Sequence, residues 1–154
     1  KRCFLTRCSL QAITDVTVKQ RQIPCGRMRV LLVEDNPVNR TLTRRLLEKL
    51  GCEVMTANDG QAASALWQWH QFDLIFMDCV MPRMDGFEAT RRLRRWEEDH
   101  HRARVPVVAL TASAMEEDEE RCRAAGMDAF VAKPVNLEML RAVLEQYCQA
   151  AAES

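Results

Sequence analysis

The chain has 154 residues, enough for one compact domain and too few for two full-sized ones. Its hydrophobic fraction of 47% excludes a chain that is disordered throughout, and no stretch reaches the ~20 consecutive apolar residues of a membrane-spanning helix. The net charge is zero, but residues 28–154 carry 16 Lys/Arg against 21 Asp/Glu. This acidic balance argues against binding of duplex DNA, whose phosphates need a positive protein face.

Residues 1–27 are the least regular part of the sequence, and we predict a linker or the tail of a preceding domain. The first residue is Lys1 rather than Met, so we expect a segment of a longer protein. One domain is predicted over residues 28–148, with a C-terminal tail over residues 149–154. The seven cysteines are an odd number without a Cys-x-x-Cys pair, which favours a reducing cytoplasm and argues against zinc.

From residue 28 onward, apolar runs alternate with helical patterns five times. The predicted strands cover residues 28–33, 52–57, 73–77, 105–110 and 129–132. The first, third and fourth are almost wholly apolar, which is typical of strands buried on both faces of a parallel sheet. Five strand–helix units predict an open α/β sheet with helices on both faces, because a closed eight-stranded barrel needs roughly twice the length.

Five helices are predicted, one after each strand. Their expected spans, caps included, are 36–51, 59–70, 87–96, 113–126 and 136–148. Asn36-Pro37 suits a helix cap followed by the first helical position. Ser113-x-x-Glu116 has the spacing of a capping box for the fourth helix.

Polar residues occupy the carboxyl end of four of the five predicted strands. Glu34 and Asp35 follow the first strand, and Asp78 follows the third. Thr111 follows the fourth and Lys133 the fifth. Since ligands of open α/β sheets bind outside these strand ends, we expect the five side chains to converge.

The residue types at these strand ends indicate phosphoryl chemistry. Three carboxylates close together repel one another unless a cation compensates them. Oxygen ligands without His or Cys favour Mg²⁺ or Mn²⁺ over zinc. One lysine and one hydroxyl add a point charge and a hydrogen bond for a phosphoryl oxygen. The set therefore predicts a site at which a phosphoryl group arrives on a carboxylate.

Four motifs occur in order over about four-fifths of the chain. They are Val33-Glu34-Asp35-Asn36-Pro37-Val38-Asn39, Met77-Asp78-Cys79-Val80-Met81-Pro82-Arg83-Met84-Asp85-Gly86, Leu110-Thr111-Ala112 and Lys133-Pro134. With these motifs the chain resembles the receiver domain of two-component response regulators. The resemblance implies a flavodoxin-like (βα)5 fold, a doubly wound parallel sheet with strand order 2-1-3-4-5. It also implies a cis bond between Lys133 and Pro134.

The resemblance assigns a role to each acid of the site. Asp78 is implied as the phosphoacceptor, which takes its phosphoryl group from a phosphohistidine on a partner. Glu34 and Asp35 are implied to hold Mg²⁺, or Mn²⁺, together with Asp78 and the backbone carbonyl of Val80. Many relatives carry Asn or Gln where this chain has Val80, so we predict slow loss of the phosphoryl group.

The resemblance also implies a conformational switch. Lys133 would contact a phosphoryl oxygen, and Thr111 would turn inward to bond it. Phe130 would then fill the space that Thr111 leaves. Because Phe130 lacks the hydroxyl of a tyrosine, a readout that depends on Tyr is not expected.

The motifs look most like those of receivers attached to hybrid histidine kinases. Residues 1–27 hold no ATP-binding Gly-rich region, so this segment is expected to receive phosphate without using ATP. The implied donor is a histidine kinase or a histidine phosphotransfer domain, docked near the helix that starts at Val38 and the loop after Lys133. A homodimer through the fourth helix, fifth strand and fifth helix is a further implied contact. We expect a cytoplasmic segment without nucleic-acid or membrane contact. The same expectation allows a parent protein that is anchored in a membrane elsewhere in its chain.

Three alternatives stay open on the sequence alone. A Mg²⁺-dependent phosphatase with Asp78 as nucleophile needs a second acid at the position of Val80. A flavodoxin-like FMN carrier needs a loop rich in Ser, Thr and Gly where this chain has Glu34-Asp35. A degenerate receiver that is not phosphorylated is expected to lack one of the five site residues.

Overall fold

The computed structural model describes residues 27–112 and 115–153, which fold around one five-stranded parallel sheet. The strands are β1 (Arg29–Val33), β2 (Glu53–Ala57), β3 (Leu74–Asp78), β4 (Val107–Thr111) and β5 (Ala129–Ala132). Their order is β2-β1-β3-β4-β5, and every neighbouring pair is parallel. The predicted fold class and strand order are confirmed. The linker predicted over residues 1–27 lies, apart from its last residue, outside the described residues.

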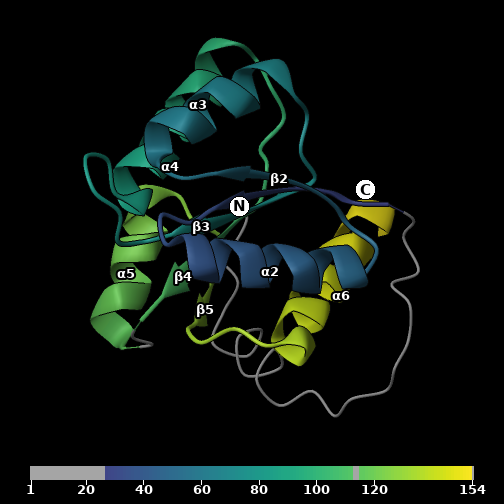
Figure 1. The fold of residues 1–154 in the computed structure, drawn as a ribbon. Coiled ribbons are helices and arrows are strands. Elements are labelled where there is room, and N and C mark those ends of the chain that lie inside the picture. Colours follow the sequence, from purple (N-terminus) through teal and green to yellow (C-terminus); the bar gives the residue numbers. More distant parts are fainter. Residues whose placement is uncertain (1–26, 113–114, 154) are drawn as a thin grey trace.

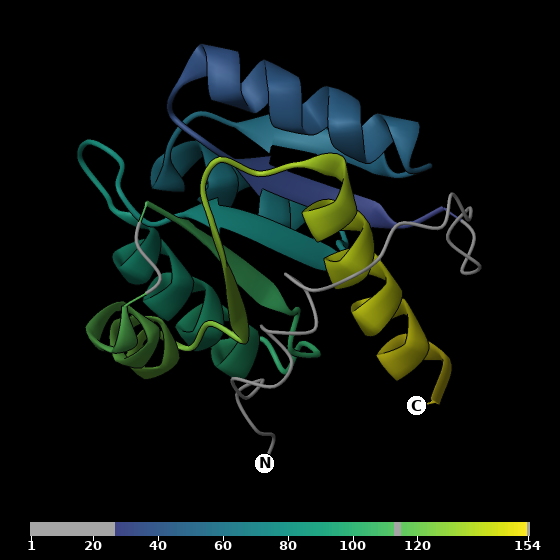
Figure 2. The same ribbon diagram turned by 90° about the horizontal axis from the view of Figure 1, so that it is seen from below.

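Helices cover both faces of the sheet (Figures 1 and 2). One face carries α2 (Pro37–Lys49) and α6 (Leu137–Glu153), and the other carries α3 (Gly60–Trp69), α4 (Gly86–Asp99) and α5 (Glu116–Ala125). Side chains of β1 alternate between the two cores: Val30 and Leu32 face α2 and α6, whereas Leu31 packs with the other helices. Every residue of β3 and β4 is buried, which explains their apolar sequences.

Three helices begin at the cap residues that the sequence predicts. Asn36 Oδ1 accepts hydrogen bonds from the backbone N–H groups of Val38 and Asn39, at 2.9 and 3.2 Å. Asp59 caps α3, and Asn136 Oδ1 accepts from the backbone of the first turn of α6. These bonds satisfy donors that have no partner within a helix. The caps therefore fix where the helices begin after the strand ends.

Two helices are longer than predicted, and one begins differently. Asp85 caps α4, which continues to Asp99 because no Gly or Pro interrupts it after Trp96. α6 continues past Cys148 to the end of the described chain. The N-cap of α5 is Met115, without a side-chain cap bond, so the predicted capping box does not start this helix; Ser113 lies outside the described residues. None of the described helices is both long enough and apolar enough to span a membrane.

A half-buried arginine ties α4 to the segments just before β4 and β5. Arg94 donates from Nη1 to Glu97 Oε1 at 2.8 Å and from Nη2 to Asp128 Oδ2 at 2.8 Å. It also donates to the backbone carbonyls of Val105 and Gly126. Only 14% of the Arg94 side chain is exposed, so these charges are largely shielded from water. The cluster therefore holds the side of the sheet opposite to the predicted site.

We expect Arg94→Met to lower the free energy of unfolding by about 3 kcal/mol, because the buried carboxylate of Glu97 loses its ion pair and Asp128 keeps only the one with Arg104. Arg95→Met is the matched control, since Arg95 is exposed on the same helix. This control should change stability by less than about 0.5 kcal/mol. Urea unfolding of both variants is the measurement, and equal losses would contradict a structural role for the Arg94 cluster.

Candidate functional site

The loop after β1 carries two acids and is held by the helix that follows it. Glu34 is buried and Asp35 is half-buried. Arg40, one turn into α2, donates from Nη1 to the backbone carbonyls of Glu34 and Asp35, at 2.9 and 3.3 Å. The backbone N–H of Asn36 donates to Glu34 Oε1 at 3.2 Å. Because Arg40 occupies both carbonyls, the loop offers its acidic side chains rather than its backbone to the sheet edge.

Asp78 is the last residue of β3, and only 3% of it is exposed. Its Oδ1 accepts a hydrogen bond from the backbone N–H of Val80 at 3.2 Å. Gly86, at the start of α4, lies so close that a Cβ atom there would collide with the backbone carbonyl of Asp78. The N–H of Gly86 donates to the carbonyl of Cys79 at 3.1 Å. A glycine at this position thus lets α4 start directly against the strand that presents Asp78.

Lys133 contacts the acids at the ends of the first and third strands. Its Nζ lies 2.9 Å from Glu34 Oε2 and 3.1 Å from Asp78 Oδ1. Its backbone N–H donates to the carbonyl of Thr111 at 2.7 Å, and its bond to Pro134 is cis, as the resemblance implies. The ammonium group is thereby placed between two buried carboxylates.

The acids form one cluster that fits a hard divalent cation. One carboxylate oxygen from each of Glu34, Asp35 and Asp78 lies within 4.8 Å of the other two. Lys133 offers one positive charge against these three carboxylates, so the cluster needs further positive charge when all three are ionised. A set of oxygen donors without His or Cys suits Mg²⁺. The structure therefore brings four of the five predicted strand-end residues together, in a donor set that matches the predicted metal.

Burial and crowding change the acidity of Asp78. Burial, followed by the hydrogen bond with Glu34, raises the pKa of Asp78 to about 7, although Lys133 pulls it down. Burial by itself would lower the pKa of Lys133, but its bonds to Glu34 and Asp78 raise that pKa above the ordinary value. Lys133 is therefore charged near neutral pH, whereas the Asp78 carboxyl group is partly protonated and partly ionised there.

The remaining predicted residues surround this cluster. Thr111 is buried at the end of β4, one residue beyond Leu110, which pairs with Asp78. Phe130 pairs with Ala109 and is buried in the core beneath α3, α4 and α5. The side chain of Val80 is 75% exposed beside Asp78. These positions are compatible with the predicted roles of Thr111, Phe130 and Val80, which stay predictions.

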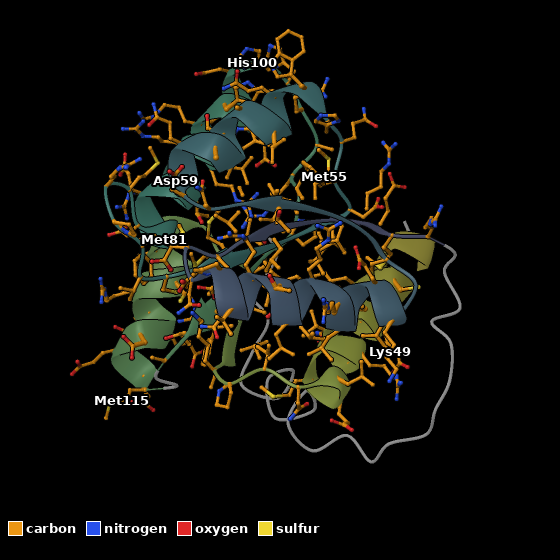
Figure 3. All side chains as sticks on the ribbon, viewed as in Figure 1. Lys49, Met55, Asp59, Met81, His100 and Met115 are labelled. Carbon is orange, nitrogen blue, oxygen red and sulfur yellow. The ribbon has the colours of Figure 1, made fainter. Side chains whose placement is uncertain are left out.

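Sequence reasoning missed two arginines that shape the site loops. Arg40 holds the acidic loop, and its only signal is its place one turn after the acid pair. Arg83 adopts a left-handed backbone conformation with φ 68°, and its Nη1 lies 3.6 Å from Asp59 Oδ2 at the start of α3. Figure 3 shows Asp59 and Met81, in the loop after Asp78, on the same side of the molecule. No sequence pattern indicates this contact.

A cavity of about 250 Å³ adjoins the acidic cluster, between α2 and the loop after β5. Glu34 and Lys133 are among its polar lining residues, and Leu42, Pro134 and Val135 are among its apolar ones. Leu42 is 52% exposed, and Val38 on the first turn of α2 is 72% exposed. An apolar surface thus lies directly beside the buried carboxylates.

Comparison with known proteins identifies what this arrangement is similar to. The family model described as "Response regulator receiver domain" matches residues 30–145. The sensor histidine kinase GacS of Pseudomonas protegens is 41% identical over 116 residues, which are 75% of this chain and 13% of GacS. The chain therefore spans only a small part of this curated relative.

Two solved structures share the fold. The receiver domain of the sensor histidine kinase PA1611 from Pseudomonas aeruginosa, crystallised with a magnesium ion in its active site cleft, is 40% identical. The match covers 79% of this chain and 98% of that one, with a TM-score of 0.71. The receiver domain of Ssk1 from Saccharomyces cerevisiae, in complex with the histidine phosphotransfer protein Ypd1, is 31% identical with a TM-score of 0.78. That match covers 82% of this chain and 92% of the other.

We expect Asp78→Asn to stabilise the metal-free protein above about pH 7. The pKa of Asp78 in the folded protein is about 7, against an ordinary value of 3.8. The unfolded chain therefore ionises first, and the wild type loses stability as the pH rises from about 4 through about 7. Asn does not titrate, so the free energy of unfolding of the variant should rise relative to that of the wild type across this window, by on the order of 2–4 kcal/mol. Urea unfolding with EDTA at several pH values measures the difference.

Addition of Mg²⁺ provides the control for this experiment. At about pH 8 the cation should raise the free energy of unfolding of the wild type more than that of Asp78→Asn, because the variant lacks one carboxylate ligand. A stability difference that does not vary with pH would contradict the raised pKa. An equal response of the two proteins to Mg²⁺ would contradict Asp78 as a ligand.

Proposed function

Because the chain belongs to the family of response regulator receiver domains, which act in phosphorelay systems, we propose that Asp78 is its phosphoacceptor. The observation that carries this proposal is the placement of the Asp78 carboxylate, buried at a strand end and 3.1 Å from the ammonium of Lys133. Glu34 and Asp35 lie in the same cluster. Glu34 shares the contact with Lys133, at 2.9 Å, so the choice of Asp78 over Glu34 rests on its place at the end of the central strand β3.

The proposed reaction is a direct transfer from phosphohistidine. An oxygen of the ionised Asp78 carboxylate attacks the phosphorus, the bond from phosphorus to the histidine nitrogen breaks, and the imidazole leaves as a neutral base after taking up a proton. Lys133 is placed to contact a phosphoryl oxygen in place of Asp78 Oδ1. Glu34, Asp35, Asp78 and the carbonyl of Val80 would hold a divalent cation, whose charge would offset that of the crowded oxygens.

Phosphorylation then acts through Thr111 and Phe130. The new phosphoryl oxygens attract the Thr111 hydroxyl at the end of β4, and the space beside it becomes available to Phe130 on β5. Thr111 is already joined to Lys133 through its backbone carbonyl, so the two switch strands meet at the site. We propose that the resulting change is read at the α5, β5 and α6 surface, which also serves a homodimer in this proposal.

The proposed phosphodonor is a histidine phosphotransfer domain or a histidine kinase. It docks on the exposed apolar side chains of Val38 and Leu42 and on the loop after Lys133, beside the cavity that opens onto Glu34. The Ssk1 receiver, in its complex with Ypd1, offers a precedent for such a partner. The similarity to GacS supports a hybrid histidine kinase as the parent protein, with this domain in the cytoplasm, where ATP is available to its kinase part.

We expect Asp78→Asn to abolish phosphoryl transfer, because the amide cannot act as the nucleophile. The measurement is label transfer from a phosphorylated histidine phosphotransfer domain, or labelling by acetyl phosphate with Mg²⁺. Asp99→Asn is the matched control, since Asp99 is exposed at the end of α4 and should leave labelling unchanged. Full labelling of Asp78→Asn would contradict the proposal.

Val80→Asn should shorten the lifetime of the phosphorylated protein by about three- to tenfold. The exposed Val80 side chain offers no hydrogen bond to a hydrolytic water, whereas an amide would orient that water beside Asp78. Decay of radiolabelled protein in Mg²⁺ buffer measures the lifetime. Val80→Ala, which also lacks a polar group, should decay like the wild type, and a wild type that decays as fast as Val80→Asn would count against the idea.

A further inference from the structure

The loop that connects β3 to α4, residues 79–85, is closed where it meets the helix. The backbone N–H of Gly86 donates to the carbonyl of Cys79 at 3.1 Å, so the two ends of the loop lie side by side. Within the loop, Met81 is buried, whereas Val80 is 75% exposed. The carbonyl of Val80 is the one backbone group in the proposed set of metal ligands. Whatever fixes the middle of this loop therefore also fixes the place of that carbonyl.

The middle of the loop is a tight turn centred on Arg83. The φ angle of Arg83 is 68°, and the backbone N–H of Met84 donates to the carbonyl of Pro82 at 2.8 Å. A hydrogen bond between residues two apart, around a central residue with positive φ, defines a γ-turn of the rare and strained kind. Such a backbone persists only where its surroundings hold it. The contacts of this turn with the rest of the molecule therefore matter for the whole loop.

The start of α3 holds the turn through two contacts. Arg83 Nη1 lies 3.6 Å from Asp59 Oδ2. The side chain of Met84 packs against Gly60, where a Cβ atom would lie only 2.8 Å from the Met84 Sδ. Asp59 is itself fixed to its helix, because its Oδ1 accepts a hydrogen bond from the backbone N–H of Ala62 at 2.7 Å. The Asp59 carboxylate thus contacts α3 with one oxygen and the loop with the other.

We propose that Arg83 and Asp59 are positioning residues for the divalent cation: their ion pair holds the γ-turn and thereby keeps the carbonyl of Val80 in place for the metal. This inference rests on the proposed function, because the Val80 carbonyl belongs to the proposed ligand set. Neither Arg83 nor Asp59 belongs to the acidic cluster itself. Mg²⁺ requires near-ideal octahedral geometry, so displacement of one ligand lowers its affinity. The Arg83 side chain is 79% exposed, so the ion pair is weak and its loss should change affinity only a few-fold.

The sign of the effect separates positioning from simple charge. If only charge mattered, loss of the Arg83 cation would strengthen Mg²⁺ binding, and loss of the Asp59 anion would weaken it. If the ion pair positions the loop, either change breaks the same contact, so both weaken Mg²⁺ binding to a similar extent. Asp59→Asn is the suitable change at the helix, because Asn caps a helix as well as Asp does. Arg83→Gln removes the charge and keeps a long polar side chain.

The probe is Mg²⁺ alone, titrated into the full chain and followed through the ¹H–¹⁵N resonance of the Val80 backbone amide. We expect Arg83→Gln and Asp59→Asn each to weaken Mg²⁺ binding about threefold. The double variant should also lose only about threefold, because the second change removes a contact that the first has already broken. Arg91→Gln is the matched control, since Arg91 forms an exposed ion pair with Glu88 within α4. This control should bind Mg²⁺ like the wild type.

Asp78→Asn in the same titration separates this inference from the proposed function. If Asp78→Asn binds Mg²⁺ as tightly as the wild type, the proposed ligand set is wrong and the inference is overturned with it. If Asp78→Asn loses Mg²⁺ binding but Arg83→Gln binds as tightly as the wild type or more tightly, only the positioning role is overturned. Losses that add in the double variant would likewise show that Arg83 and Asp59 act separately, against the inference.

Discussion

The contact of one lysine with two buried carboxylates is the constraint around which the domain is arranged. Glu34 and Asp78 are nearly inaccessible to water, and Lys133 lies within 3.1 Å of both. Buried charges are tolerated only when they are paired, so these three strand ends must stay in register. The central strands β1 and β3 are therefore buried on both faces, and the chemistry is confined to the carboxyl edge of the sheet.

Packing elsewhere in the molecule supports this edge. Gly86 brings α4 against the backbone of Asp78, and Arg40 fixes the acidic loop from α2. At the far end of the sheet, the Arg94 cluster holds α4 to the beginning of β4 and β5. The two ends are thus fixed by different means: polar contacts to backbone at the site, and a half-buried cluster of ion pairs opposite it. The surface between α3 and α4 is left with an aromatic cleft that neither group of contacts fills.

Much of this arrangement could be predicted from the sequence, because its signals are local. Apolar runs gave the strands to within two residues, and Asn36 and Asp59 marked helix starts through their own side chains. The strand-end acids and Lys133 could be expected to meet because parallel strands end at one edge. Contacts between distant segments carry no such signal: Arg83 with Asp59, and the hidden indole of Trp67, depend on packing that only the folded chain reveals. The start of α5 was also missed, since Met115 offers no capping group.

The placement of Lys133 has a consequence for how salts act on the domain. Three acids and one ammonium leave two surplus negative charges, which a single divalent ion neutralises. An aspartyl phosphate carries about one more negative charge than the carboxylate it replaces. Electroneutrality is then lost at a site that is mostly closed to counterions, and the imbalance persists for as long as the signal does. The ionic atmosphere around α2 and the loop after β5 should therefore influence how readily the phosphoryl group is handed on.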